Sequence, residues 1–292
     1  MPAARTLACA ATVLVMIGGC RPGASGPKVT LRYHPPAGAA YHYALDQQNA
    51  MRIEGGPMSA MPEQTFRMKM YYTQLVKGPA AAGAGGGVAV LVTFDSTSLD
   101  APGMGAGAMQ PALDRMRGMR SNIVYDDRMR VLSAAFTGLA GAPSPVTEQL
   151  GTSLKAMAFP LPEGPVGLGD SWVTEHEMPL GQQLNASHPI KARTKLTVKE
   201  ITVAGPDTSV VFAVETSFPG EPIELKQQGQ QVTMTLTGNL SGEQVYSVAR
   251  SAHVRSNMGG TMKISVRGGQ AGRGEMRMAM TQQTSLQLTE AK

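Results

Sequence analysis

The sequence has little cysteine, no long apolar segment and no block of basic residues. Its main apolar run, Leu7 to Ile17, is too short to cross roughly 30 Å of hydrocarbon as a helix. The formal charge of +5 is spread over scattered lysines and arginines that do not alternate with aromatic residues. A nucleic-acid-binding surface is therefore not expected.

The first residues have the pattern of an export signal. Arg5 supplies a short positive region, and the apolar run follows it directly. Ile17-Gly18-Gly19-Cys20 then resembles the lipobox of bacterial lipoproteins, in which the chain is cut before a cysteine that carries the lipid. We therefore expect residues 1–19 to be a lipoprotein signal peptide and Cys20 to be the lipidated (palmitate-bearing) N-terminus. An ordinary secretory signal with an incidental cysteine is the alternative.

The cysteine count agrees with this interpretation. Only Cys9 and Cys20 are present, and Cys9 lies inside the signal, so the exported chain would keep one cysteine and form no intrachain disulfide. Several acyl chains, at about 0.8 kcal/mol per buried CH₂, would hold the protein on a membrane. The next residue is Arg21 rather than Asp. By resemblance to lipoprotein sorting in bacteria with two membranes, this favours the outer membrane, with the protein facing the periplasm.

Most of the remaining chain predicts β-strands. Residues 20–28 are a Gly/Pro/Ser-rich tether with nothing to bury. Strands are expected over 29–33, 41–53, 66–76, 88–94, 195–203, 208–215, 261–266 and 274–288, with hairpins over 122–132 and 232–249. The two hairpins are expected to turn at Asp126-Asp127 and at Ser241-Gly242. With only about two short helices, over 111–119 and 144–158, the predicted fold is mainly β, built of curved antiparallel sheets.

The stretch from Phe159 to Trp172 divides the chain. It is rich in proline and glycine, holds the only tryptophan, and is flanked by strand patterns in roughly the same order. Gly169-Asp170-Ser171-Trp172 echoes Gly38-Ala39-Ala40-Tyr41, a glycine followed by an aromatic that opens a strand. We therefore predict two related β-rich halves, residues 29–158 and 159–292, with Trp172 buried where the second begins.

These segments also carry a family resemblance. Leu31-Arg32-Tyr33, the Gly38 to Tyr41 entry, Phe159-Pro160-Leu161-Pro162, Pro165-Val166 and Gly169-Asp170-Ser171-Trp172 resemble the shared motifs of one family. It is an uncharacterised family of bacterial envelope lipoproteins, a domain of unknown function. The resemblance covers most of the mature chain, but its motifs are short and structural, and the closing strands match only loosely. It implies an envelope lipoprotein and supplies no catalytic residues.

No constellation of catalytic residues stands out. Gly169-Asp170-Ser171 matches the nucleophile block of a lipase family, but those enzymes carry it near the mature N-terminus and follow it with Asp-x-x-His. A tight turn that opens a strand is the better interpretation. The histidines are dispersed, and adjacent strand residues such as Glu175-His176-Glu177 point to opposite faces, so no zinc site and no cofactor are expected.

Methionine is abundant and leaves two hypotheses open. Spacings such as Met58-x-x-Met61 and Met276-x-Met278-x-Met280 resemble thioether sites for Cu(I), but the second also alternates as any half-buried strand does. Phe66, Met68, Met70 and Tyr72 share one strand face and could line a groove together with the second methionine run.

From these features we expect a non-enzymatic, lipid-anchored envelope protein that binds or scaffolds something, with an apolar ligand as the sharper version. Its partners would be a membrane, through the lipid anchor, and a lipid or another envelope protein. An envelope hydrolase and a purely structural or assembly lipoprotein are the alternatives.

Overall fold

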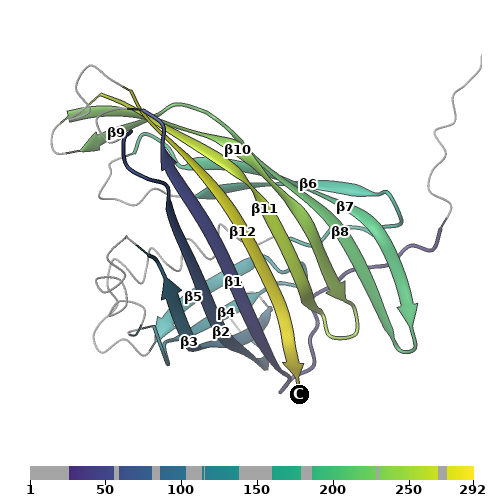
Figure 1. Ribbon diagram of the computed structural model, residues 1–292. Coiled ribbons are helices and arrows are strands. Elements are labelled where there is room, and N and C mark those ends of the chain that lie inside the picture. The colour runs from purple at the N-terminus through teal and green to yellow at the C-terminus, as the bar shows by residue number, and fades with distance from the viewer. Residues whose placement is uncertain are drawn as a thin grey trace, which may run out of the picture.

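The described part of the protein is a single curved sheet (Figure 1). The computed structural model describes residues 26–55, 59–80, 86–102, 114, 116–137, 160–178, 186–227, 230–268 and 275–292. The strands are β1 (Ala40–Ile53), β2 (Gln64–Pro79), β3 (Val88–Asp100), β4 (Arg120–Tyr125), β5 (Val131–Thr137), β6 (Ser171–Met178), β7 (Ile190–Ala204), β8 (Asp207–Pro219), β9 (Ile223–Gln227), β10 (Gln230–Ser247), β11 (Ala252–Gly268) and β12 (Glu275–Ala291).

The 12 strands pair in the order β5-β4-β3-β2-β1-β12-β11-β10-β8-β7-β6, and β9 pairs with β10. Every pairing is antiparallel, which confirms the predicted fold class. Strands from residues 29–158 form one wing, strands from 159–292 form the other, and the β1–β12 pair joins them. The expected helix over 144–158 lies outside the described residues. Of the one expected over 111–119, residues 116–118 form a turn.

Local hairpins follow the sequence pattern where the turn residues are unambiguous. β2 pairs with β3 as expected, and β4 pairs with β5 around a turn that begins at Asp126. The turn expected at Ser241-Gly242 is wrong, because β10 runs straight through both residues and pairs with β8 on one side and β11 on the other.

Gly242 belongs instead to a glycine crease, which we define as Gly238 and Gly242 of β10 and Gly260 of β11. A Cβ at these positions would lie 2.3, 1.9 and 2.0 Å from backbone oxygens of the facing strand. No L-residue with a side chain fits such a close approach, so glycine here permits the two strands to fold against each other. The crease therefore brings β10 and β11 close together and does not end a strand.

The segment expected as a first strand, residues 29–33, is not part of the sheet, which corrects that prediction. It lies on the concave side beside residues 160–166, and the two form a single bridge between Val29 and Val166 (N–O 2.8 and 2.9 Å). We call these two segments the plug. Its apolar side chains include the buried Leu31 and Leu161. Because a single bridge pairs few backbone groups, other donors must satisfy the buried carbonyls of the plug.

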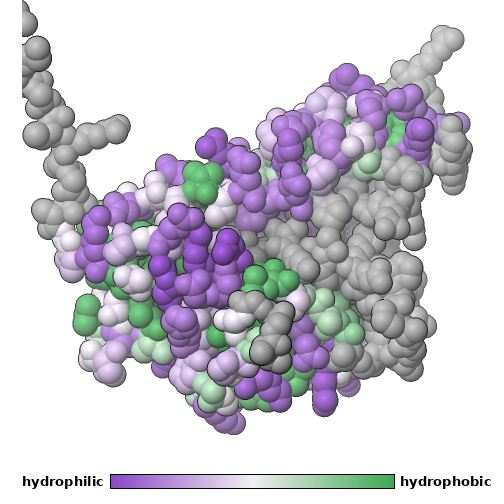
Figure 2. All heavy atoms as spheres, turned by 180° about the vertical axis from the view of Figure 1, so that it is seen from behind, coloured by the Kyte–Doolittle hydropathy of each residue, from purple (hydrophilic) through white to green (hydrophobic). Residues whose placement is uncertain are grey.

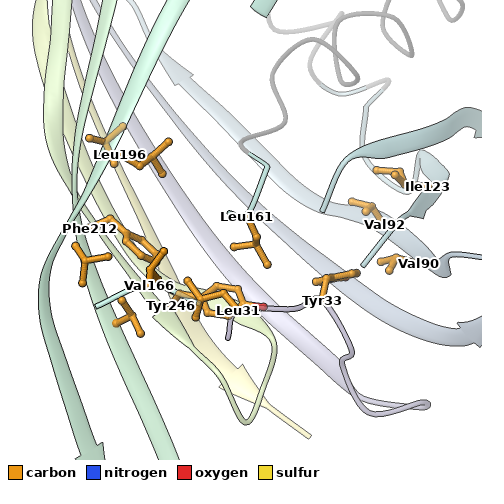
Figure 3. Close-up of a cluster of buried hydrophobic side chains, with 13 residues drawn as sticks. Leu31, Tyr33, Val90, Val92, Ile123, Leu161, Val166, Leu196, Phe212 and Tyr246 are labelled. Carbon is orange, nitrogen blue, oxygen red and sulfur yellow. The ribbon is translucent and has the colours of Figure 1, made fainter. Parts of the chain in front are cut away.

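The plug joins the two wings of the sheet through the main hydrophobic core (Figure 3). One side of this core comes from β3 and β4, the other from β7, β8 and β10, and plug residues lie between them. The buried members are Leu31, Tyr33, Val90, Val92, Ile123, Leu161, Val166, Leu196, Val198, Val210, Phe212, Val214 and Tyr246. Burial of this cluster is the main force that closes this end of the curved sheet.

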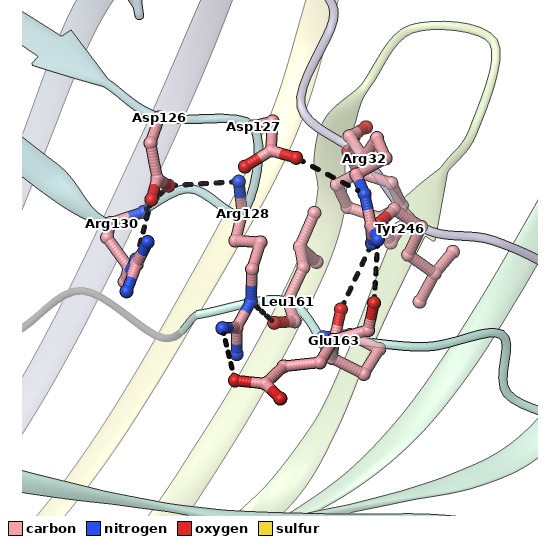
Figure 4. Close-up of polar contacts among 10 residues, drawn as sticks. Arg32, Asp126, Asp127, Arg128, Arg130, Leu161, Glu163 and Tyr246 are labelled. Atoms are coloured by element: carbon pink, nitrogen blue, oxygen red, sulfur yellow. Dashed lines mark hydrogen bonds and ion pairs between the residues drawn. The ribbon is translucent and has the colours of Figure 1, made fainter. Parts of the chain in front are cut away.

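Hydrogen bonds fix the plug in place (Figure 4). Arg32 donates to the carbonyls of Pro162 and Glu163, and Arg128 of the β4–β5 turn donates to the carbonyl of Leu161 at 2.9 Å. From the opposite wing, the Tyr246 hydroxyl donates to the carbonyl of Arg32 at 2.9 Å. Two arginines and one tyrosine thus supply donors that a strand neighbour would otherwise supply.

Trp172 stands where β6 begins, as expected, but it is half-buried rather than buried. Its ring packs edge-on against Phe212 with centroids 5.5 Å apart, and its Nε1 donates to the carbonyl of Pro160 at 3.0 Å. A tryptophan with one apolar face and one satisfied N–H is well placed at the margin of a core.

Candidate functional site

The strand positions that face the concave side carry no formal charge. Side chains alternate along each strand, so the register assigns the paired strand residues, those outside the β-bulges, to the concave or the convex side. The concave positions assigned in this way carry no Asp, Glu, Lys or Arg. Charged residues stand on the convex side, as in the pair formed by Arg67 and Asp46. The concave side therefore offers an uncharged surface, most of it apolar.

At the open end, away from the plug, this surface is only half-buried. We define the methionine face as Met51 of β1, Met262 and Ile264 of β11, and Met276, Met278 and Met280 of β12. The register places Met280 between Met51 and Met262, and Met278 beside Ile264. Met262 is buried and the other five are intermediate in exposure, unlike the fully buried residues around the plug. The expected sharing of one face by the three β12 methionines is confirmed.

The second expected face, on β2, lies on the same side. Phe66, Met68, Met70 and Tyr72 point into the concavity, where Tyr72 stacks on Tyr43 with centroids 5.2 Å apart. β1 separates this face from the methionine run of β12. The two faces predicted from sequence thus belong to one apolar surface that spans β2, β1, β12 and β11.

A row of uncharged polar side chains crosses this surface. We call Gln47 and Asn49 of β1 with Gln282 and Thr284 of β12 the polar belt, since Asn49 stands opposite Gln282 and Gln47 opposite Thr284. Gln47 Nε2 donates to Asn49 Oδ1 at 3.4 Å, and Gln282 Nε2 donates to Thr284 Oγ1 at 3.1 Å. Asn49 is only 4 % exposed, yet its Nδ2 has no hydrogen-bond partner in the structure. Sequence reasoning missed the belt.

Grooves lined by described residues also occur on the convex side. One of them has a volume of about 620 Å³ and is lined from β1, β2, β11 and β12 by side chains such as Lys69, Gln48 and Gln283. There the hydrogen bond from Arg67 holds the pKa of Asp46 below its usual value. Figure 2 shows the face seen from behind, where hydrophobic residues form small groups among hydrophilic ones. The convex groove thus carries charged side chains such as Arg67 and Lys69, which the concave strand positions do not.

The candidate catalytic block is a turn. Gly169 has φ +82°, and the Asp170 carboxylate accepts a hydrogen bond from the backbone N–H of Gly167 at 2.9 Å. The Ser171 side chain is exposed at the start of β6. This geometry occupies Asp170 with the turn itself, as the sequence pattern indicated.

A hydroxyl–imidazole contact occurs on the convex side. Thr73 Oγ1 lies 2.9 Å from His42 Nδ1, and the same hydroxyl donates to the Asp95 carboxylate at 2.7 Å. Because the single hydroxyl proton goes to Asp95, His42 cannot be the base that activates Thr73. Within the described ranges, no group of three or more His, Cys, Asp or Glu side chains is placed to hold a metal ion.

Two histidines lie at least partly inside the fold. His253 is half-buried beside Tyr246, and loss of hydration lowers the pKa of its imidazole to about 4. His176, on the concave side of β6, has its Nε2 2.9 Å from Thr174 Oγ1. The Nδ1 of His253 is buried without a hydrogen-bond partner in the structure, so no carboxylate orients this imidazole through Nδ1 as in a catalytic or metal-ligating histidine.

The described residues include no helix that is long and apolar enough to cross a membrane. Cys20 and residues 1–19 lie outside the described residues, so lipidation stays a prediction from sequence.

Comparison with known proteins assigns no family to this chain. No protein-family model matches the chain, and no curated protein sequence matches it. Among solved structures, the chain is similar to a TodX monoaromatic hydrocarbon channel (a deltaS2 mutant) at 9% sequence identity. The match covers 86% of this chain and 90% of the channel chain, with a TM-score of 0.18. A likeness at that score carries no argument about fold or function.

Proposed function

We propose that the protein is a non-enzymatic, lipid-anchored binding protein of the bacterial envelope that holds the apolar chain of a lipid against its methionine face. The observation that carries this proposal is the contrast between the two ends of the concave side. Around the plug, apolar side chains are buried, whereas on the methionine face they are contiguous and all but Met262 are only half-buried. Contiguous apolar surface of this kind is typical of ligand or partner sites.

Methionine suits an acyl chain better than a rigid ligand. Its unbranched thioether side chain has three rotatable bonds and repacks at low cost, so a methionine lining adapts to chains of different length and unsaturation. The lipid anchor expected at Cys20 would keep this surface next to a membrane, where such chains are found. The predicted outer-membrane location, facing the periplasm, belongs to the same proposal.

The test measures uptake of an uncharged apolar fluorophore, diphenylhexatriene, by the chain carrying Cys20→Ser, which has no acyl group of its own. Met278→Asp places a carboxylate on the methionine face, and we expect it to weaken uptake by about tenfold or more, because a charge there has no described partner. Ala279→Asp is the matched control, since it adds the same charge to the adjacent convex position, opposite Arg52 and Lys263.

Equal uptake by the two aspartate variants, with both folded, would contradict the proposal. Extraction of the purified Cys20→Ser protein for co-purified lipid provides a second measurement that needs no variant. Tight binding of Cu(I) without uptake of either lipid or fluorophore would instead favour a thioether metal site.

A further inference from the structure

The polar belt lies between two apolar regions of the concave side. Along β1 the concave residues run Leu45, Gln47, Asn49, Met51, and along β12 the facing residues run Leu286, Thr284, Gln282, Met280. Successive residues on one face of a strand are about 6.6–6.8 Å apart. An acyl chain that lies on the methionine face, parallel to the strands, would therefore reach the hydrogen-bonding side chains of the polar belt where the methionine face ends.

Asn49 is the member of the polar belt whose side-chain donor has no hydrogen-bond partner. Its Oδ1 already accepts from Gln47 Nε2 at 3.4 Å, while its Nδ2 is buried without any acceptor. A buried amide nitrogen without an acceptor is rare in folded proteins, because the lost hydrogen bonds to water are not replaced. A ligand atom that accepts a hydrogen bond would replace them, and an oxygen acceptor suits this amide donor.

The charge of that acceptor follows from its surroundings. Concave positions of the described strands next to the belt carry Phe66 and Met68 on β2, Met258 and Gly260 on β11, and no lysine or arginine. An anionic head group, such as a phosphate or a free carboxylate, would lose its hydration there without gaining a cationic partner. An uncharged carbonyl loses much less, and a single amide N–H satisfies it.

We infer that the belt selects lipids whose chain ends in an uncharged acyl carbonyl, an ester or an amide, with Asn49 Nδ2 as the hydrogen-bond donor. This inference rests on the proposed function and names the ligand class of the same site. It distinguishes acyl esters and amides from free fatty acids and from plain hydrocarbons of the same length.

The experiment compares hexadecane, methyl palmitate and palmitate, in isotope-labelled form, as ligands of the full chain carrying Cys20→Ser. Asn49→Leu keeps the size of the side chain but removes the donor. We expect the preference for methyl palmitate over hexadecane to fall by about tenfold in this variant. Met51→Leu is the matched control, two residues further along the same face. It should alter binding of both ligands equally and leave their ratio unchanged.

An infrared measurement separates a hydrogen bond from a change of shape. The carbonyl stretch of ¹³C-labelled methyl palmitate should move to lower wavenumber on binding to the unsubstituted site and return in Asn49→Leu. Should Asn49→Leu fail to fold, Asn49→Ser shortens the donor and is expected to reduce the same shift.

The outcomes distinguish failure of the inferred preference for an acyl carbonyl from failure of the proposed binding of apolar chains. An unchanged ester-to-hydrocarbon ratio, or a carbonyl stretch that does not move on binding, overturns the inference while the apolar-binding function stands. Tighter binding of palmitate anion than of its methyl ester also overturns it. Binding of none of the three ligands overturns the proposed function itself.

Discussion

A methyl group at the glycine crease should destabilise the protein strongly, although the same change one residue away should not. In Gly260→Ala the new Cβ would lie 2.0 Å from the carbonyl oxygen of Asn239, whereas optimal carbon contacts are at about 3.5–4.0 Å. The strands must therefore separate by more than an ångström. We estimate about 1–3 kcal/mol for the overpacking and about 1 kcal/mol for each weakened ladder hydrogen bond, or roughly 3 kcal/mol in total.

Gly259→Ala is the matched control for this prediction. Its Cβ would meet nothing closer than the Gln282 carbonyl oxygen at 3.5 Å, which is ordinary contact. Because glycine inside a strand loses more conformational entropy on folding than alanine does, this variant should be neutral or more stable by about 0.5 kcal/mol.

Urea unfolding followed by the fluorescence of Trp172, the only tryptophan, measures both variants. For a chain of this size, roughly 3 kcal/mol corresponds to a fall in Tm of about 6–12 °C. Equal unfolding free energies for Gly260→Ala and Gly259→Ala would refute the argument that the crease requires glycine.

The remaining predictions concern charge, a hydrogen bond and the anchor. The folded protein keeps His253 neutral with a pKa of about 4 against 6.5 for the ordinary group, so the unfolded chain takes up the proton first as pH falls. The unfolding free energy should therefore decrease between about pH 6.5 and pH 4, and His253→Leu should remove that decrease; parallel pH curves for the two proteins would contradict this. Tyr246→Phe leaves the Arg32 carbonyl without its donor and should lower the unfolding free energy by about 1 kcal/mol, whereas Tyr71→Phe, at an exposed side chain, should not change it. Cys20→Ala should release the protein from the membrane fraction, and intact mass should show the loss of residues 1–19 plus acyl mass in the parent; membrane association that persists in the variant would rule out the anchor.

Strand positions could be predicted from sequence where alternation was strong. Arg67 and Lys69 alternate with Met68 and Met70, and β2 forms over these residues and pairs with β3 across a short connection. Such pairing depends on neighbours in sequence. The β1–β12 pair at the centre of the sheet depends on residues more than 200 positions apart, and no local pattern encodes it.

The errors have a common physical origin. Ser241-Gly242 has the composition of a turn, but glycine also permits close approach of two backbones, and local sequence does not distinguish these uses. Residues 29–33 alternate like a strand, yet Leu31 and Tyr33 are buried by the two wings of the sheet that meet around them and not by strand neighbours. In each case tertiary contacts decided between two local conformations that the residues allow.

The polar belt was missed for the opposite reason. Gln47 and Asn49 interrupt an apolar alternation, which in sequence weakens the evidence for a strand instead of marking a site. Only the register shows that they face Thr284 and Gln282, which interrupt the alternation of β12 at the same level. Two interruptions that coincide in space on a surface without charge are a stronger indication of function than either one alone.

The crease connects the stability of the fold with the proposed ligand surface. Gly238 stands between Phe218 of β8 and Met262 of β11, and these two large side chains belong to one cluster that also contacts Met280. A side chain on Gly238 would collide with the Thr261 carbonyl oxygen and force β10 away from β11. The neighbouring strand β8, which carries Phe218, would then move away from the methionine face with β10. The glycines of the crease therefore also set how closely Phe218 packs against Met262, and so how much of the methionine face would be open to an acyl chain.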